Sequence, residues 1–147
     1  MFYNTHQYSM DKKGRVSIPA QFRESLQELG DTKIALTIYQ AGAYRYLLAL
    51  PHSIWLTKAA GLEGRTFDPQ SREFRRYLMS RMEVCPMDKQ GRILISPQLR
   101  DYAGLTKDIS LAGVGQSFEI WDRQAFDNYF SQMDTTIGEE VLQRLDF

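Results

Sequence analysis

The sequence has few of the residues that disulfide-bonded, membrane-embedded or metal-dependent proteins require. Cys85 is the only cysteine, so the chain cannot form an internal disulfide, and this fits a reducing compartment such as the cytoplasm. No apolar run approaches the roughly 18 residues of a membrane-spanning helix, and the N-terminus lacks the apolar segment of a secretory signal. His6 and His52 have no metal-ligand spacing with each other or with Cys85. We therefore expect a cytoplasmic protein with no metal, no cofactor and no membrane partner.

The chain also has no net charge, with 18 Lys and Arg against 18 Asp and Glu. The distribution is uneven, because residues 1–81 hold 12 basic against 7 acidic side chains and residues 82–147 hold 6 against 11. Such asymmetry can mark a basic binding face, or an attraction between the two halves or between subunits. The 147 residues, 43% of them hydrophobic, suffice for a normal core in one domain or in two halves that share one. The charge thus permits nucleic-acid binding without indicating it.

One segment occurs twice in the chain. Residues 10–24 align without gaps on residues 87–101 at a constant offset of 77, and eight of the fifteen pairs are identical. Most of the other pairs are similar in kind, such as Phe22 with Leu99. A duplicated supersecondary unit explains this similarity best. Both copies contain the pattern Asp-x-x-x-Arg, so a function assigned to the chain has to account for two copies of it.

Each copy predicts a strand, a glycine turn and a second strand. In the first copy the strands are expected at 6–10 and 15–18, where polar and apolar residues alternate. Lys13 and Gly14 supply a tight turn between them, because glycine adopts positive φ without steric cost. The second copy has the same order of residue types, so we expect the same local structure there.

Both copies then predict a helix. In the first copy Pro19 is suited to the first helical position and Gly30 ends the helix. In the second, Ser96 is a good N-cap, Pro97 is suited to the first position and Gly104 closes the helix. Pro97 lies one position later than Pro19 in the alignment, so the two helix starts need not superpose. The apolar face of the first helix is expected to consist of Phe22, Leu26 and Leu29.

The remaining patterns predict strands at 33–39, 44–50, 109–112 and 117–121, helices at 53–61, 68–81 and 123–133, and a loop at 61–67. The expected fold class is α+β, with two pseudo-symmetric β/α units, each a hairpin, a short helix and a strand pair, in one compact body with peripheral helices. The expected division is a first unit at 5–53, a helical connector at 54–81, a second unit at 82–125, and a C-terminal helix and tail at 126–147.

The Asp-x-x-x-Arg pattern is expected to bracket a hairpin turn, Asp11 with Arg15 and Asp88 with Arg92. A turn aspartate can accept hydrogen bonds from backbone N–H groups two or three residues on, and can pair with the arginine and so orient its guanidinium. An arginine held in this way can make a bidentate contact with a phosphate, or with O6 and N7 of guanine in the major groove. The alternative is a surface ion pair that only braces the turn, worth about 0–1 kcal/mol.

Catalytic patterns are missing from the sequence. It contains no Gly-rich phosphate loop, no nucleophile elbow and no His-Glu-x-x-His pattern. Asp11 and Asp88 could form a carboxylate dyad at a pseudo-twofold axis, but the arginine four residues after each one favours the charged form and opposes a shared proton. We therefore expect neither an enzyme nor a small-molecule substrate.

The repeated segment resembles a known DNA-binding unit. Residues 10–19 read Met-Asp-Lys-Lys-Gly-Arg-Val-Ser-Ile-Pro, and residues 87–97 read Met-Asp-Lys-Gln-Gly-Arg-Ile-Leu-Ile-Ser-Pro. This pattern, followed by a short helix and a strand pair, is similar to the SpoVT/AbrB-like unit. Two such units in a chain of this length resemble the MraZ family of bacterial transcriptional regulators. Further matches to that family are residues 83–85, 99–100, 103–107 and 118–122.

The resemblance implies a fold, a partner and a function. The two units would form one pseudo-twofold body, and subunits would close into a ring with many Asp-x-x-x-Arg loops on one rim. Such proteins bind double-stranded DNA in the nucleoid, at short G-rich direct repeats upstream of their own gene at the head of a cell-division and cell-wall gene cluster, which they usually repress. The residues implied to contact DNA are Asp11, Lys12, Lys13, Gly14, Arg15, Asp88, Lys89, Gly91 and Arg92.

Two other functions stay open. AbrB-like units also serve in antitoxins, where a tail blocks a toxin, and the candidate tail here is 134–147. Its possible anchors are Val141, Leu142, Leu145 and Phe147. A ring scaffold with no DNA role is the other alternative. A basic patch on the 68–81 helix suits a solvated face, an acidic neighbouring subunit or DNA, and consists of Arg72, Arg75, Arg76 and Arg81.

Overall fold

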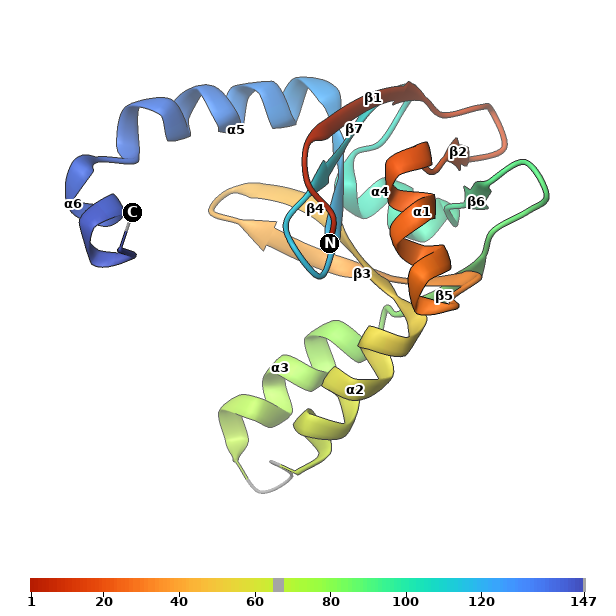
Figure 1. The fold of residues 1–147 in the computed structure, drawn as a ribbon, viewed down its shortest axis with the longest axis horizontal. Helices are drawn as coiled ribbons and strands as arrows, with labels where there is room; N and C mark the ends of the chain where they lie inside the picture. Colours follow the sequence, from red (N-terminus) through yellow and green to blue (C-terminus); the bar gives the residue numbers. More distant parts are fainter. Residues whose placement is uncertain (65–67, 147) are drawn as a thin grey trace.

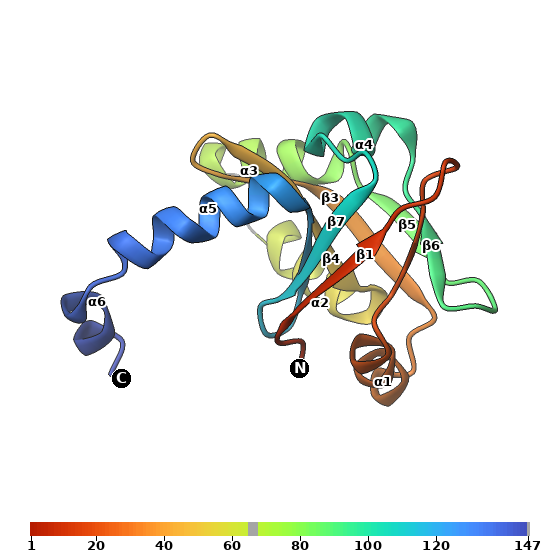
Figure 2. The same cartoon turned by 90° about the horizontal axis from the view of Figure 1, so that it is seen from above.

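The computed structural model describes residues 1–64 and 68–146, shown as a ribbon in Figure 1 and from above in Figure 2. The strands are β1 (Thr5–Ser9), β2 (Arg15–Ser17), β3 (Lys33–Ala41), β4 (Tyr44–Pro51), β5 (Glu83–Pro86), β6 (Arg92–Leu94), β7 (Asp108–Gly113) and β8 (Phe118–Asp122). The helices are α1 (Ala20–Leu29), α2 (His52–Glu63), α3 (Pro69–Met79), α4 (Pro97–Ala103), α5 (Arg123–Thr136) and α6 (Glu139–Arg144). The expected α+β class with two β/α units in one body is confirmed.

Strands from the two halves are interleaved in one antiparallel sheet. Its order is β1-β7-β8-β4-β3-β5, so β1 of the first half pairs with β7 of the second, β4 pairs with β8, and β5 pairs with β3. Each edge strand of the sheet, β1 or β5, therefore pairs with a strand from the other half of the chain. Neither half retains its full set of strand partners without the other.

A separate two-stranded ribbon joins the halves a second time. β2 pairs with β6 in antiparallel register, with Val16 opposite Ile93 at its centre. The strands on either side of each Asp-x-x-x-Arg loop therefore do not form one hairpin ladder: β1 pairs with β7 while β2 pairs with β6. Each loop links the large sheet to the ribbon.

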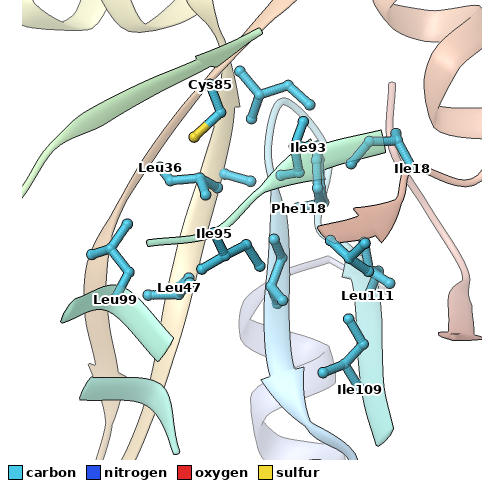
Figure 3. Close-up of a cluster of buried hydrophobic side chains, with 14 of the residues drawn as sticks. Ile18, Leu36, Leu47, Cys85, Ile93, Ile95, Leu99, Ile109, Leu111 and Phe118 are labelled. Carbon is cyan, nitrogen blue, oxygen red and sulfur yellow. The ribbon is translucent and has the colours of Figure 1, made fainter. Parts of the chain in front are cut away.

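The core lies between the ribbon and the sheet and draws on both halves. Figure 3 shows Ile18, Ile95 and Phe118 pointing into the same cluster of buried side chains. Ile18 and Ile95 are equivalent in the repeat, and both are almost completely buried. Cys85 lies in the same cluster, as expected of a small apolar side chain, and burial raises the pKa of its thiol to about 11. One shared core therefore holds both units together.

The two repeat helices begin at equivalent positions, and the expectation that Pro19 occupies the first helical position is wrong, because Pro19 precedes that position. α1 begins at Ala20 with Pro19 as its N-cap residue, and α4 begins at Pro97 with Ser96 as its N-cap. Proline is tolerated at either site because the N–H groups of the first helical turn have no partner inside the helix. The prediction that Leu29 faces the core is wrong, since the side chain is 46% exposed at the last turn of α1.

α2 and α3 form a pair that projects from the sheet, as Figure 1 shows. Asp68 caps α3 by accepting a hydrogen bond from the backbone N–H of Gln70. The loop expected at 61–67 is wrong for residues 61–63, which continue α2, and residues 65–67 lie outside the described part. The pair is held to the sheet by a second cluster of buried residues, Ala35, Leu50 and Trp55.

α5 and α6 form an arm that leaves the body at the opposite end from the β2–β6 ribbon (Figures 1 and 2). Asp122 caps α5 by accepting a hydrogen bond from the backbone N–H of Ala125. Within the described residues, neither α5 nor α6 has a buried side chain. Among residues 1–64 and 68–146, no helix is long and apolar enough to span a bilayer.

Candidate nucleic-acid interface

The first Asp-x-x-x-Arg loop is closed by one carboxylate. Oδ1 of Asp11 accepts hydrogen bonds from the backbone N–H of Lys13 at 3.0 Å and of Arg15 at 2.9 Å, so the acceptor role is confirmed, with partners two and four residues on. Oδ2 accepts from Nε of Arg15 at 2.7 Å. The backbone adds Gly14 N–H to Asp11 O and Asp11 N–H to Arg15 O, both at 3.0 Å. The carboxylate thus fixes both the loop and the arginine.

The second loop repeats this network bond for bond. Oδ1 of Asp88 accepts from the backbone N–H of Gln90 at 2.8 Å and of Arg92 at 2.9 Å, and Oδ2 accepts from Nε of Arg92 at 3.0 Å. The backbone bonds from Gly91 N–H to Asp88 O and from Asp88 N–H to Arg92 O complete it, at 3.0 and 2.8 Å. Duplication has preserved the geometry as well as the sequence.

Each arginine keeps part of its guanidinium available. The side chains of Arg15 and Arg92 are 36% and 29% exposed, and only Nε of each is engaged by the aspartate. Within the described residues, the terminal amino groups of both make no hydrogen bond. An arginine held through Nε can direct both amino groups outward together, which is what a bidentate contact with a guanine edge or a phosphate requires.

Both aspartates are held in the charged form. Hydrogen bonding by the backbone N–H of Arg15 is the largest cause that lowers the pKa of Asp11 to about 2, with the Arg15 side chain adding to it. The pKa of Asp88 is lowered in the same way, first by the backbone N–H of Arg92. Lowered pKa values in both carboxyls are the opposite of what a dyad that shares a proton requires.

The two loops project from one end of the body, the end formed by the β2–β6 ribbon (Figure 1). Because β2 and β6 are antiparallel, the first loop joins β2 beside the C-terminal end of β6, and the second loop joins β6 beside the C-terminal end of β2. Ile18 N–H donates to Gly91 O, and Ile95 N–H donates to Gly14 O, both at 2.9 Å. Each loop is therefore tied by its glycine carbonyl to the opposite half. Lys12, Lys13 and Lys89 are exposed on the same loops.

Glycine is required at the turn of both loops. Gly14 has φ +93° and Gly91 has φ +74°, which side chains with a Cβ rarely adopt. A Cβ at Gly14 would lie 2.7 Å from Ile95 O, and one at Gly91 would lie 2.8 Å from Cδ of Arg23. The turn thus needs glycine for its φ and for the close approach of the opposite half.

Two residues that the sequence did not single out lie against the loops. Arg23 covers Gly91, and Arg100 covers Gly14, with its Cζ and Nε 2.9 Å from where a Cβ would be. Both arginines are among the identical pairs of the repeat, and this was the signal that could have identified them. The basic patch on α3 is elsewhere, on the projecting helix pair, where Arg75 forms an ion pair with Glu63 at 3.4 Å.

The comparisons with known proteins match this chain along most of its length. The family model of the MraZ protein matches residues 1–60 and 78–145, which include both loops and both repeat helices. The chain belongs to the MraZ family. A relative from Acetivibrio thermocellus is 41% identical over 146 residues, 99% of this chain and 96% of the relative. One from Anaeromyxobacter dehalogenans (strain 2CP-C) is 38% identical over 134 residues, 89% of this chain and 90% of the relative. Both are named transcriptional regulator MraZ.

The MraZ match agrees with the resemblance on which the expected site residues depend. The names of these relatives describe regulators of transcription and no catalytic activity, in agreement with the expectation that the chain is not an enzyme. In the described part of the chain, no three His, Cys, Asp or Glu side chains are grouped so that they could hold a metal ion.

Replacing Gly91 with alanine is expected to destabilise the protein more than a change of φ alone explains. The left-handed conformation costs a non-glycine residue about 1–2 kcal/mol, and the Cβ would also displace Arg23. Gly42→Ala is the matched control, because Gly42 has φ +58° and nothing within 4 Å of its Cβ position. Urea denaturation at equal protein concentration measures both. Equal losses in the two variants would show that close contact with Arg23 is unimportant.

The Asp11 network is expected to persist in acid. A carboxyl whose pKa is lowered from 3.8 to about 2 stabilises the folded protein above pH 3.8, and this contribution is lost as the pH falls through 2. Carboxyl ¹³C NMR is expected to show Asp11 still mostly ionised near pH about 3. Arg15→Ala is expected to raise the pKa only partly, because backbone N–H groups remain. A wild-type Asp11 that titrates at 3.8 or above contradicts the network.

Proposed function

We propose that the chain is a DNA-binding transcriptional regulator and that the two Asp-x-x-x-Arg loops are its DNA-binding elements. The observation that carries this proposal is the repeated network in which Asp11 and Asp88 each hold one Nε and leave the terminal amino groups of Arg15 and Arg92 unbonded within the described chain. Two loops at one end suit a partner with repeated features.

The chemistry of the loops favours guanine in the major groove. Terminal amino groups of arginine can donate to O6 and N7 of one guanine, the commonest specific contact in protein–DNA complexes. Lys12, Lys13 and Lys89 would contact phosphates, which adds affinity without reading sequence. The neutral chain then needs only a locally basic end, and the acidic second half need not face DNA.

We further propose that the DNA consists of short G-rich direct repeats upstream of the chain's own gene, and that binding in the cytoplasmic nucleoid represses a cell-division and cell-wall gene cluster. The names of the relatives support regulation of transcription, and the operator, the nucleoid and the repression are proposed from the resemblance to the family. Direct repeats suit a protein that presents the same loop more than once, because a second contact becomes intramolecular once the first has formed.

Assembly into a ring would bring several loops to one such site, and the C-terminal arm supports self-association. Phe130, Ile137, Leu142 and Leu145 are 45–62% exposed on α5, α6 and their junction. Residues 126–146 hold five acidic side chains against one basic, whereas residues 54–81 hold six basic against three acidic. An apolar groove between α2, α3 and the sheet is lined by Trp55, Leu62 and Phe74 among others, and its charged lining residues are Lys58 and Glu119. We therefore propose that the exposed apolar side chains of the arm of one copy enter this groove on the next.

Arg15→Ala is expected to lower affinity for the upstream DNA by roughly 1–3 kcal/mol if the side chain reads guanine, and Arg92→Ala by a similar amount. Fluorescence anisotropy at several salt concentrations, with a scrambled sequence beside the upstream DNA, measures both. If an arginine contacts phosphate alone, its variant weakens all sequences alike and reduces the salt slope by about one.

Arg72→Ala is the matched control for the loss of one exposed arginine. Arg72 lies on α3, outside the loops, and is exposed. If DNA affinity falls as much in this control as in the loop variants, the DNA-binding face includes α3. No selective binding by folded wild-type protein would reject the proposed function altogether.

The second candidate is a protein-binding module in which the arm contacts a different protein, as in an antitoxin. Leu142→Glu with Leu145→Glu is expected to lower the oligomer's molar mass in light scattering if the arm joins copies, because two carboxylates would enter the apolar contact. Leu29→Glu, at a side chain 46% exposed on α1, is the control. An unchanged oligomer in the arm variant would favour the protein-binding module over the arm-joined ring.

A further inference from the structure

The two loops are attached crosswise. The carbonyl of Gly91, in the second loop, accepts from the N–H of Ile18 in the first half, and the carbonyl of Gly14, in the first loop, accepts from the N–H of Ile95 in the second. Ile18 and Ile95 are the residues that follow β2 and β6, directly before the repeat helices. The helix nearest to each loop therefore belongs to the opposite half.

One arginine from each of these helices lies on the loop of the other half. Arg23, on α1, approaches Gly91 so closely that a Cβ there would lie 2.8 Å from its Cδ and 3.0 Å from its Nη1. Its Nε also donates to the carbonyl of Ile18 at 3.1 Å. Arg23 thus donates to Ile18, the residue whose N–H bonds to the carbonyl of Gly91, and the aliphatic part of the Arg23 side chain covers Gly91 itself.

Arg100, on α4, stands in the equivalent place against the first loop. A Cβ at Gly14 would lie 2.9 Å from both Cζ and Nε of Arg100 and 2.7 Å from the carbonyl of Ile95. The guanidinium plane is therefore packed on the glycine backbone. Its Nε is buried and has no hydrogen-bond partner among the described residues, which is costly unless the packing compensates. The missing Cβ of the glycine makes room for this contact.

We propose that Arg23 and Arg100 are positioning residues that hold the DNA-binding loops crosswise, Arg23 for the loop of Arg92 and Arg100 for the loop of Arg15. The proposal rests on the proposed function for its consequence in DNA binding, but not for its structural content. Arginine suits this task because its stem packs on backbone while its planar end keeps a fixed orientation. Each half of the chain then prepares the other half's loop for contact.

The crosswise arrangement has a signature that a direct phosphate contact lacks. Removal of Arg23 is expected to loosen the second loop and leave the first unchanged, although Arg23 belongs to the first half of the sequence. Its effect on DNA affinity should be non-additive with Arg92→Ala and additive with Arg15→Ala, because residues that act through one element couple and distant ones do not. A direct phosphate contact by Arg23 would be additive with both.

Hydrogen exchange of the free protein, followed by mass spectrometry on peptides covering 10–17 and 87–94, is the first test, because these ranges leave out Ile18 and Ile95, whose N–H groups bond to the opposite loop. Arg23→Ala is expected to speed exchange in 87–94 about tenfold, as the loss of one ordinary hydrogen bond does, and to leave 10–17 unchanged. Arg100→Ala is expected to do the reverse. Arg100→Met, which keeps most of the stem volume, replaces Arg100→Ala if that variant does not fold. Arg72→Ala serves as the control for charge.

The second test is the double-mutant cycle on DNA affinity, with the four arginine variants combined in pairs. The proposal is supported if each variant speeds exchange only in the loop of the opposite half and its effect on DNA affinity is non-additive only with the arginine of that loop. If each variant speeds exchange only in the loop of the opposite half, but the wild-type protein does not bind DNA selectively, then the positioning role of Arg23 and Arg100 is supported and the proposed function is rejected. The positioning role is overturned, whatever the DNA result, if a variant changes exchange in both loops alike, in the loop of its own half, or in neither loop.

Discussion

Antiparallel pairing of β2 with β6 is the interaction on which the rest of the structure depends. It places Val16 opposite Ile93 in the shared core and, on the same two strands, brings Arg15 and Arg92 to the loops at one end of the body. Core and candidate interface are thus parts of one ribbon. A change that separates the halves would expose the core and release both loops at once, so the fold cannot lose one without the other.

The loops combine three kinds of residue with different tasks. The aspartate fixes the backbone and Nε of the arginine, the glycine supplies a positive φ and room for the opposite half, and the arginine presents its remaining donors. Such a site needs little net charge, because its orientation is set before any ligand arrives. A chain of zero net charge can therefore carry a DNA-binding end.

The arrangement of the molecule would separate the proposed DNA contact from the proposed contact between copies. The ribbon and its loops lie at one end, and the arm of α5 and α6 leaves from the other (Figure 2). Copies joined through the arm would leave the loops uncovered, and further loops would raise the local concentration of weak contacts. The crosswise contacts of Arg23 and Arg100 add a link within each subunit, so that each of the two loops, 77 residues apart in sequence, lies against a helix of the other half.

Features that depend on near neighbours along the chain could be predicted from the residues alone. Most strand and helix positions, the glycine turns, the cap at Ser96 and the Asp–Arg pairs four residues apart follow from local hydrogen bonding, and the repeat doubled the signal for the two loops. The pairing of β2 with β6, the exposure of Leu29 and the positions of Arg23 and Arg100 on the opposite loops became visible only in the folded chain. These depend on the packing of segments far apart in sequence, and local propensity carries no information about which distant backbone will be the partner.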